Sequence, residues 1–404
     1  MPATLDQALA AARDTRCLEI GHNILDRVPK VFSRLFPNRA AILIADPHTF
    51  AAAGENVLHH LRAQGIPMRA PLLLDAPDLY AESRFVEPIQ NALADHDAIP
   101  IAVGSGTIND LVKLAAHRCR RRYLCVATAA SMDGYTAFGA SITHHGSKQT
   151  FDCPAPLAVV ADLEVIARAP AEMTGWGYAD LSAKITAGAD WLLAEALGVE
   201  PVDALAWDIA QSRLHEALVI PLDIAALVEG LMLAGFAMQR HKTSRPASGA
   251  EHQFSHLWDM QHHMHEGHAP SHGAKVGIAT LAVTAFYEAL LDMDLSQINT
   301  DALAAAWPDD ATWLARAEAC FADPELLAVA RRELAAKAVT RDELHTQLKR
   351  LQTVWPDLRL RLKRQLLPLA ELKQRLQTAG APVEPEQIGI SRARLHDSFI
   401  AAYF

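Results

Sequence analysis

The sequence predicts an α/β domain with a parallel sheet over residues 1–168 and an all-helical domain over residues 169–404. Three observations lead to this prediction. Short apolar runs alternate with helical segments as far as Pro170, which is the pattern of a parallel sheet covered on both faces. Beyond Pro170 no run has the character of a strand, and apolar residues recur at helical spacing. A chain of 404 residues is long enough for two or three domains, and with these two we expect a site in the cleft between them.

Each predicted strand is a short apolar run that stops at polar or turn-forming residues. The expected strands are residues 40–45, 69–74, 99–103, 123–127 and 157–161. The expected helices that separate them are residues 51–64, 83–95 and 109–120. In the second domain, residues 324–338 and 342–351 have the pattern of amphipathic helices. Parallel sheets bind ligands beyond the carboxyl ends of their strands, so the polar residues at those ends are site candidates.

Composition excludes several classes of protein. The formal net charge of −10 argues against nucleic-acid binding, which needs a basic surface. The five cysteines form no CxxC pair, which suits a reducing compartment, and the N-terminus lacks the pattern of a signal peptide, so we expect a cytoplasmic protein. The most membrane-like run, residues 217–238, contains Asp223 and Glu229 and is better explained as a buried helix than as a membrane span.

A glycine loop follows the strand predicted over residues 99–103 and opens the next helix. Glycines let the backbone approach a pyrophosphate, and a helix N-terminus offers free N–H groups and the positive end of its dipole. The loop therefore predicts a Rossmann-like dinucleotide site for NAD(H) or NADP(H), although Asn109 stands where a third glycine is usual. The candidate contacts in this loop are Gly104, Ser105, Gly106, Thr107, Asn109 and Asp110.

Two other strand ends carry polar candidates. Asp46 closes the strand over residues 40–45, where a carboxylate can accept hydrogen bonds from a ribose diol; the alternative is a simple turn aspartate. The segment after residues 123–127 brings Thr128, Ser131 and Asp133 to the same edge of the sheet.

A histidine-rich stretch in the second domain indicates a metal site. Seven of the nineteen histidines fall between positions 252 and 272. His252 and His256 share one face of a helix, and neutral imidazole binds borderline divalent metals. A catalytic site needs about three protein ligands and an open position. Asp180, beside Gly175 and Gly177 at the domain junction, is the acidic residue best placed to complete the set, although it can instead pair with Lys184 four residues later.

These segments together resemble one family. The order GSGTINDLVK, TAASMDGYTAFGASI, GYADLSAK, SRPASGAEHQFSHLWD and PSHGAKVGIAT resembles the sn-glycerol-1-phosphate dehydrogenases, of the iron-containing alcohol dehydrogenase and dehydroquinate synthase-like superfamily. The resemblance runs from about Ile20 to Ala285. It implies metal ligation by Asp180, His252 and His272. It implies dinucleotide contacts from Asp46, Gly106, Thr107, Asp110, Thr128 and Ser131, and a substrate contact from Asp133.

The resemblance also implies a reaction and its cofactors. Family members reduce dihydroxyacetone phosphate to sn-glycerol 1-phosphate with NAD(P)H and one divalent metal, and are usually dimers or larger. Some iron-dependent relatives have a further histidine ligand where this chain has Lys184, so zinc or nickel is expected ahead of iron. The substrate phosphate needs cations, for which the candidates are Lys148, Lys184 and Arg245. Either His256 or His268 is expected to relay the proton or to support the metal ligands from behind, and the catalytic candidates also include Asp133 and Lys184.

Three alternatives remain open at this point. A glycerol or polyol dehydrogenase acts on an unphosphorylated substrate, and Arg245 with the SRPASG segment weighs against it. A dehydroquinate synthase-like cyclase typically has glutamate in the place of Asp180. A non-catalytic metal-binding module would leave the glycine loop and the polar strand ends unexplained.

Overall fold

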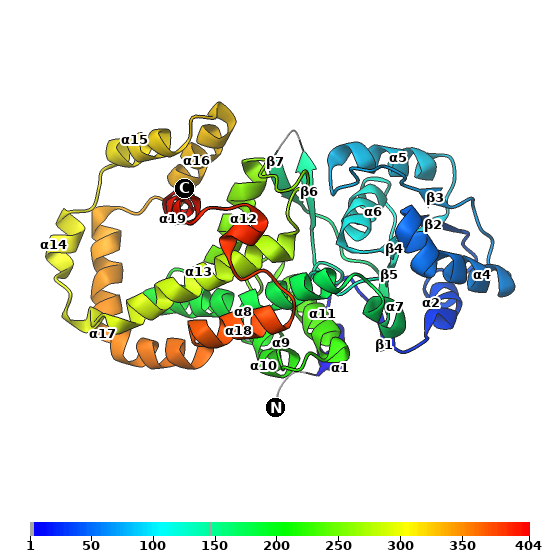
Figure 1. The fold of residues 1–404 in the computed structure, drawn as a ribbon, viewed down its shortest axis with the longest axis horizontal. Helices are drawn as coiled ribbons and strands as arrows, with labels where there is room; N and C mark the ends of the chain where they lie inside the picture. The colour runs from blue at the N-terminus through cyan, green and yellow to red at the C-terminus, as the bar shows by residue number, and fades with distance from the viewer. Residues whose placement is uncertain (1–3, 145–146) are drawn as a thin grey trace.

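The computed structural model describes residues 4–144 and 147–404 and shows an α/β part beside a helical part (Figure 1). The sheet of the α/β part has six strands, all parallel, in the order β1-β8-β5-β4-β2-β3. Their bounds are β1 Cys17–Gly21, β2 Ala41–Ala45, β3 Leu72–Leu73, β4 Ile99–Gly104, β5 Leu124–Ala127 and β8 Ala158–Asp162. This arrangement confirms the predicted fold class, and four of the five predicted strands match closely.

Two features of the strands differ from the predictions. The strand predicted over residues 69–74 is reduced to β3, and the edge strand β1 was not predicted. An antiparallel hairpin of β6 (Ala140–His144) and β7 (Ser147–Phe151) was also not predicted. It projects between the two parts of the molecule, where β7 packs against α12 (Ala250–Met260) (Figure 1).

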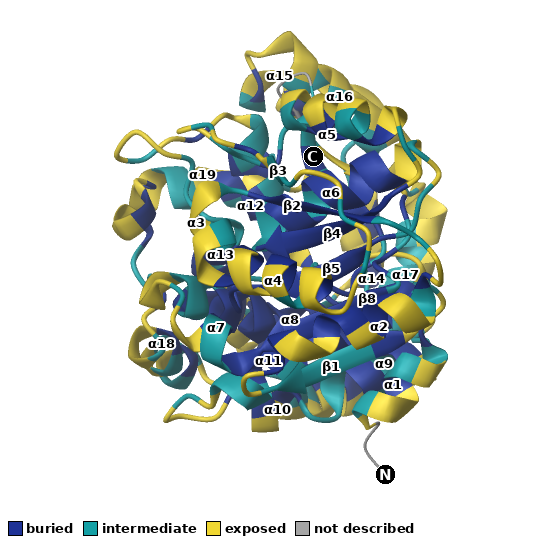
Figure 2. Cartoon of the chain, turned by 90° about the vertical axis from the view of Figure 1, so that its right-hand side faces the viewer, coloured by how far each residue is buried: buried dark blue, intermediate teal, exposed yellow. Residues whose placement is uncertain are grey.

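Helices cover both faces of the sheet because side chains on both faces are apolar. Figure 2 shows the central strands as the buried layer between more exposed helices. Leu43 faces the side of α2 and α4, whereas Ile42 and Ile44 face the side of α5 and α6. The helices and turns of this part are α1 Leu5–Ala11, η1 Leu25–Arg27, α2 Val28–Leu35, α3 Pro47–Thr49, η2 Phe50–Gly54, α4 Glu55–Ala63, α5 Ser83–Ala94, α6 Gly106–Arg118 and α7 Leu163–Ala167.

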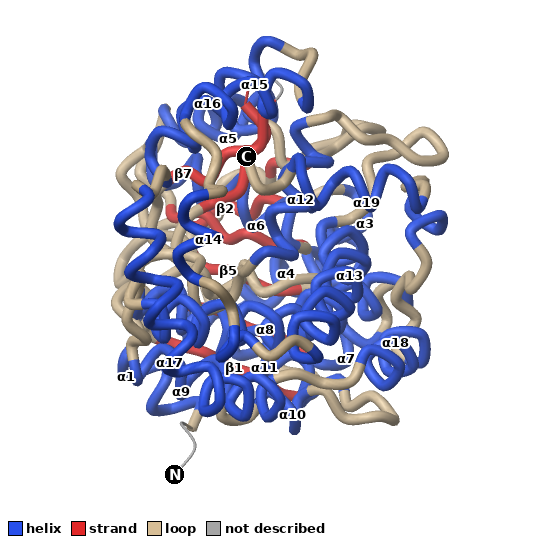
Figure 3. The backbone as a smooth tube through the Cα atoms, turned by 90° about the vertical axis from the view of Figure 1, so that its left-hand side faces the viewer, coloured by secondary structure: helices blue, strands red, loops and turns tan. Residues whose placement is uncertain are grey.

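The second part is helical from α8 (Ala171–Leu197) onward, next to the boundary that we propose between residues 168 and 169. Among the described residues no sheet strand follows Asp162, and Figure 3 shows these helices in front of the strands. They are α9 Ala204–Gln211, α10 Leu214–Ala217, α11 Ile224–His241, α12, α13 His272–Asp292, η3 Leu295–Gln297, α14 Thr300–Ala305, α15 Asp310–Cys320, α16 Pro324–Lys337, α17 Arg341–Gln365, α18 Leu369–Thr378, η4 Pro385–Ile388 and α19 Arg392–Ala401.

Three of these helices position the candidate site. α13 packs against both α8 and α12, and all three bury most of their length. α13 is long and apolar enough to cross a membrane, but 72% of its apolar window is buried, as in the core helix of a folded domain. The run over residues 217–238, singled out above as membrane-like, lies mostly in α11, whose middle is also buried, in agreement with the prediction.

Candidate active site

A cavity of about 890 Å³ lies where the carboxyl edge of the sheet meets the helical part. The loops after β4 and β5 form one side, the hairpin residue Lys148 another, and the ends of α12 and α13 a third. Of the predicted residues, those that line it are Ser105, Gly106, Thr107, Asp110, Ser131, Asp133, Lys148, His252, His256, His268 and His272. Segments far apart in the sequence therefore meet around one space, as expected for a cleft between domains.

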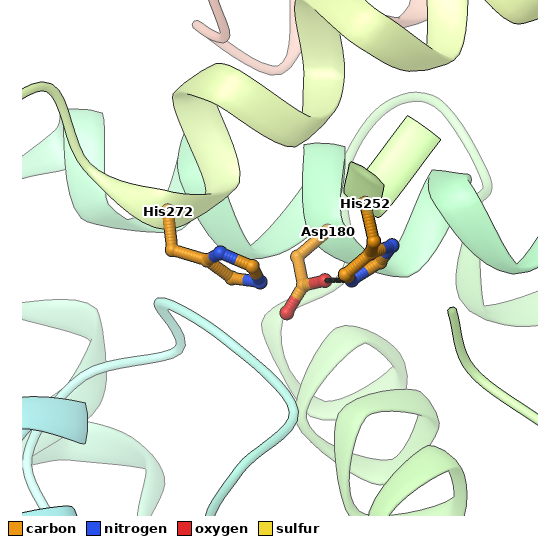
Figure 4. Close-up of side chains that lie close together, drawn as sticks. All are labelled: Asp180, His252 and His272. Atoms are coloured by element: carbon orange, nitrogen blue, oxygen red, sulfur yellow. Dashed lines mark ion pairs between the residues drawn. The ribbon is translucent and has the colours of Figure 1, made fainter. Parts of the chain in front are cut away.

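Three side chains from three helices converge beside this cavity. Asp180 comes from α8, His252 from α12 and His272 from the first residue of α13 (Figure 4). One ligand atom from each lies within 4.8 Å of the others, and His252 Nε2 is 3.7 Å from Asp180 Oδ1. Two imidazoles and one carboxylate are a donor set that suits zinc and similar divalent ions, with a position left open for substrate. The donor set therefore fits the predicted metal.

The carboxylate of Asp180, the acidic member of this candidate metal site, is held ionised. Asp180 is fully buried, and burial alone would raise its pKa, but Lys184, His272 and His252 lower that pKa to about 2. Lys184 Nζ lies 2.8 Å from Asp180 Oδ1 and 2.7 Å from Asp133 Oδ2. Burial and the nearby Asp180 charge raise the pKa of Asp133, against the effect of Lys184. Asp133 N donates to Asp180 Oδ2 at 2.9 Å, so the loop after β5 is fixed to the metal site.

Neighbouring side chains orient the two candidate histidine ligands, and burial keeps one of them, His272, uncharged. Burial lowers the pKa of His272 well below its ordinary value, which keeps a ring nitrogen free to bind a cation. Its Nδ1 lies 3.4 Å from Ser255 Oγ. His252 Nδ1 lies 2.8 Å from Glu251 Oε1, so Nε2 is the nitrogen that faces Asp180.

The glycine loop has the geometry of a phosphate site. α6 begins at Gly106, and the side chain of Ser105 makes no capping hydrogen bond, so the N–H groups at this helix start are open to the cavity. A Cβ at Gly106 would collide with the side chain of Met132, and one at Gly104 would collide with Ile108. Both positions therefore favour glycine for close packing.

Several predicted nucleotide contacts are not part of the cavity lining. Asn109 is fully buried, where it accepts from Tyr123 OH at 3.0 Å and donates to Gly134 O at 3.2 Å, so its side chain is structural rather than a cofactor contact. Gly104 and Thr128 are outside the cavity lining. The Asp46 carboxylate accepts from the N–H groups of residues 48 and 49 as the cap of α3, which is the turn role given above as its alternative.

The three basic side chains that were candidates for binding the substrate phosphate have different surroundings. Arg245 is outside the main cavity; its Nε lies 2.9 Å from Glu200 Oε2, and it borders a neighbouring cavity of about 550 Å³. Lys184 is fully buried between two carboxylates and does not line the main cavity. Both side chains are therefore already paired with carboxylates, and neither lines the main cavity. Lys148 does line the main cavity, 4.9 Å from the centre of the Tyr80 ring, and burial lowers its pKa.

Both candidate proton relays line the cavity, with different exposure. His256 is half-buried and makes no hydrogen bond with any of the described residues; burial lowers its pKa to about 4. His268 is exposed on a tight turn, where its backbone pairs with that of His265 and where Glu266 and Gly267 both have positive φ.

Comparisons with known proteins decide the family. A model of the iron-containing alcohol dehydrogenases matches residues 19–170. Glycerol-1-phosphate dehydrogenase [NAD(P)+] from Halalkalibacterium halodurans is 34% identical over 281 residues, which are 67% of this chain and 70% of the relative. The chain belongs to the glycerol-1-phosphate dehydrogenase family. The enzyme of the same name from Geobacillus stearothermophilus is 32% identical over 340 residues, 78% of this chain and 82% of the relative.

Solved structures agree with this fold. Maleylacetate reductase from Agrobacterium tumefaciens superposes with a TM-score of 0.58 at 15% identity, covering 97% of this chain and 90% of that one. The family resemblance stated from the motifs is therefore confirmed. As a glycerol-1-phosphate dehydrogenase family member, the chain is an oxidoreductase, with NAD(P) and a divalent metal as its cofactors.

The family motifs did not reveal every residue of this site. Glu251 was part of the quoted SRPASGAEH segment, but its contact with His252 was not predicted. The segment over residues 380–388 also lines the cavity, although it lies in the C-terminal tail, where the sequence offered no motif. This segment and the following helix α19 hold the histidine-rich loop: His263 Nε2 lies 2.6 Å from Ile388 O, and its Nδ1 lies 2.8 Å from Nη1 of Arg394 in α19.

Proposed function

We propose that this protein reduces dihydroxyacetone phosphate to sn-glycerol 1-phosphate with NADH or NADPH, reversibly. The observation that carries the proposal is the position of Asp180, His252 and His272, which converge at the same cavity as the open N-terminus of α6. A dinucleotide whose pyrophosphate rests on that helix start would extend its nicotinamide along the carboxyl edge of the sheet. The relatives named above support the phosphorylated substrate.

The residues divide into three tasks. Asp180, His252 and His272 hold one divalent cation, for which we propose zinc or nickel ahead of iron, because Lys184 stands where a fourth ligand would be and is already paired with Asp180. The bound cation supplies polarisation of the C2 carbonyl and stabilisation of the developing alkoxide. Ser105, Gly106 and Thr107 bind the dinucleotide phosphates, and Asp110 and Ser131 contact the rest of the cofactor.

Other residues that line the main cavity bind the substrate and transfer the proton. Lys148 provides the positive charge for the substrate phosphate. Asp133 lies beside the metal ligands, and its carboxylate accepts a hydrogen bond from a substrate hydroxyl. His256, which has no hydrogen-bond partner among the described residues, relays the proton to the alkoxide through its neutral ring.

The test is oxidation of NADH and of NADPH by protein stripped with a chelator and reloaded with zinc, nickel or iron. Dihydroxyacetone phosphate and unphosphorylated dihydroxyacetone are compared in parallel. We expect reduction of the phosphorylated ketone to predominate and to disappear when the metal is removed. A preference for dihydroxyacetone would instead indicate a polyol dehydrogenase. Absence of turnover with every metal and both cofactors would contradict the proposal.

Two further properties remain predictions. We expect a homo-oligomer, a dimer or larger, which sedimentation of the metal-loaded protein would test. We also expect a cytoplasmic enzyme, which fractionation of the producing cells would test.

A further inference from the structure

Glu251 is a charged residue that is fully buried directly behind the metal site. Its Oε1 lies 2.8 Å from Nδ1 of the ligand His252, on the side of the ring opposite to Asp180. Charged side chains are rarely buried in full unless specific partners hold them, so this position needs an explanation. The reaction proposed above uses His252 and gives no task to Glu251.

The Glu251 carboxylate is held rigidly from two directions. Gly249 N donates to Oε1 at 2.7 Å, and Thr186 Oγ1 lies 2.7 Å from Oε2. Glu251 also lies in the first turn of α12, where the helix dipole favours a negative charge. A Cβ at Gly249 would come within 2.9 Å of Glu251 Oε2, so the glycine before the helix leaves room for this arrangement.

Asp190 and its partners fix the start of α12, the helix that carries both Glu251 and His252. Asp190 Oδ2 accepts from Ala250 N at 2.6 Å, and Tyr287 OH donates to Asp190 Oδ1 at 2.5 Å. Arg245 Nη2 lies 3.4 Å from Asp190 O, and the same guanidinium pairs with Glu200. The SRPASGAEH segment therefore supports His252 from behind, through Arg245, Gly249 and Glu251.

We propose that Glu251 is the positioning residue of the metal site, because it fixes the tautomer and the orientation of His252. Oε1 already accepts the Gly249 N–H, so it acts as an acceptor toward the histidine as well. Nδ1 of His252 therefore carries the proton, and the lone pair of Nε2 faces Asp180 and the cation position. A carboxylate behind a ligand histidine also raises its basicity and strengthens metal binding. This inference rests on the metal site of the proposed function.

The test compares two variants of Glu251. In E251L no acceptor remains for Nδ1. In E251Q the amide oxygen can keep both the Gly249 and the His252 hydrogen bonds, while the new NH2 group faces Thr186 Oγ1, which can donate to Ala183 O at 3.0 Å. We expect the zinc dissociation constant, measured by chelator competition, to rise about 10- to 100-fold in E251L. A smaller rise is expected in E251Q, because the geometry is kept and only the charge is lost.

The matched control is Ser398→Ala. Ser398 is a buried residue of α19 whose hydroxyl accepts a hydrogen bond from the indole of Trp258, at 2.9 Å. Trp258 lies on α12 with Glu251, so loss of the hydroxyl loosens α12 without touching a metal ligand. We expect S398A to lower the melting temperature and to leave the zinc dissociation constant unchanged. The absorption spectrum of the cobalt(II)-substituted protein should change in E251L and not in S398A.

The outcomes separate this inference from the proposed function. If E251L binds zinc as tightly as the wild type, or if S398A weakens zinc binding equally, Glu251 does not position the ligand. If E251L does not fold, E251Q tests the charge alone, and an unchanged zinc dissociation constant in E251Q overturns the claim that the Glu251 carboxylate strengthens metal binding. If the wild-type protein itself binds no stoichiometric zinc, nickel or iron, it is the proposed function that fails.

Discussion

Lys184 Nζ lies 2.8 Å from Asp180 Oδ1, and both side chains are fully buried. The same ammonium group is 2.7 Å from Asp133 Oδ2, so one lysine neutralises two carboxylates beside the metal position. The sequence suggested a substrate or catalytic contact for this lysine. In the structure it is the internal counter-ion of Asp180 and Asp133, and it does not line the cavity.

This relationship predicts the effect of Lys184→Met. Loss of one partner leaves buried carboxylates uncompensated, so we expect the free energy of unfolding of the metal-free protein to fall by about 3–5 kcal/mol. Saturating zinc should recover part of this loss, because the cation replaces the missing positive charge at Asp180. Urea unfolding with chelator and with zinc measures both effects.

A matched control for that prediction is Lys113→Met. Lys113 is equally buried; it donates to the carbonyl oxygens of Gly134, Ala137 and Gly139, lies 3.4 Å from Asp110 Oδ1, and makes no hydrogen bond or ion pair with Asp180, His252 or His272 among the described residues. We expect it to destabilise the protein without any extra recovery by zinc. A Lys184→Met protein with normal stability and a raised KM for the ketone would show that the lysine contacts substrate after all.

The second prediction concerns pH and His256. Burial, His252, Lys148 and Lys275 lower the pKa of His256 to about 4, against the effect of Asp259. In the unfolded chain the histidine pKa is about 6.5. Between about pH 4 and pH 6.5 the unfolded chain therefore binds a proton at His256 that the folded protein does not bind. The contribution of His256 to stability is therefore complete above about pH 6.5 and is lost as the pH falls toward 4, by up to about 3 kcal/mol.

Replacement of His256 by glutamine isolates this effect, because an amide side chain at this position does not titrate. We expect His256→Gln to lose less stability than the wild type between pH 7 and pH 4.5 when urea midpoints are measured with a chelator present. Parallel stability curves for the two proteins would mean that the ring is not held neutral by the fold.

The third prediction concerns the glycine loop. In Gly106→Val the new side chain would meet Met132, whose flexible end can move, so the fold should tolerate the change. The added atoms would keep a pyrophosphate away from the start of α6, and we expect the dissociation constant for NADH to rise about tenfold or more, which is a loss of about 1.4 kcal/mol. Fluorescence titration with NADH measures this, with the zinc dissociation constant as the control that should not change. Unaltered NADH binding would place the cofactor elsewhere.

The fold was predictable where physical constraints act locally. β2 and β4 are buried on both faces, so they appear in the sequence as continuous apolar runs. The edge strand β1 contains Glu19 and is only partly buried, so it lacks that signal. The β6–β7 hairpin is similarly polar, and its place between the two parts depends on long-range packing that no local pattern reports.

The candidate site divides in the same way. The histidine-rich stretch predicted a metal site and the family resemblance implied its three ligands; the structure brings Asp180, His252 and His272 together. Asn109 and Arg245 were assigned to ligands because their side chains have suitable chemistry. Their actual partners, Tyr123 and Glu200, are distant in sequence or belong to another element, so only the folded chain shows that they are already engaged.

The last prediction tests recognition of the substrate phosphate. Lys148 is the only one of the three cations predicted for this role that lines the main cavity. A hydrogen bond to a charged group contributes about 1.5–3 kcal/mol, so Lys148→Met should lower kcat/KM for dihydroxyacetone phosphate by about 10- to 100-fold. It should leave kcat/KM for unphosphorylated dihydroxyacetone nearly unchanged, because that ketone has no anionic group for Lys148 to contact.

Arg245→Met is the matched control: its guanidinium pairs with Glu200 outside the main cavity, so the ratio of the two kcat/KM values should stay at the wild-type level. If the ratio instead collapses in Arg245→Met and not in Lys148→Met, the phosphate lies toward the neighbouring cavity and the assignment of Lys148 is wrong.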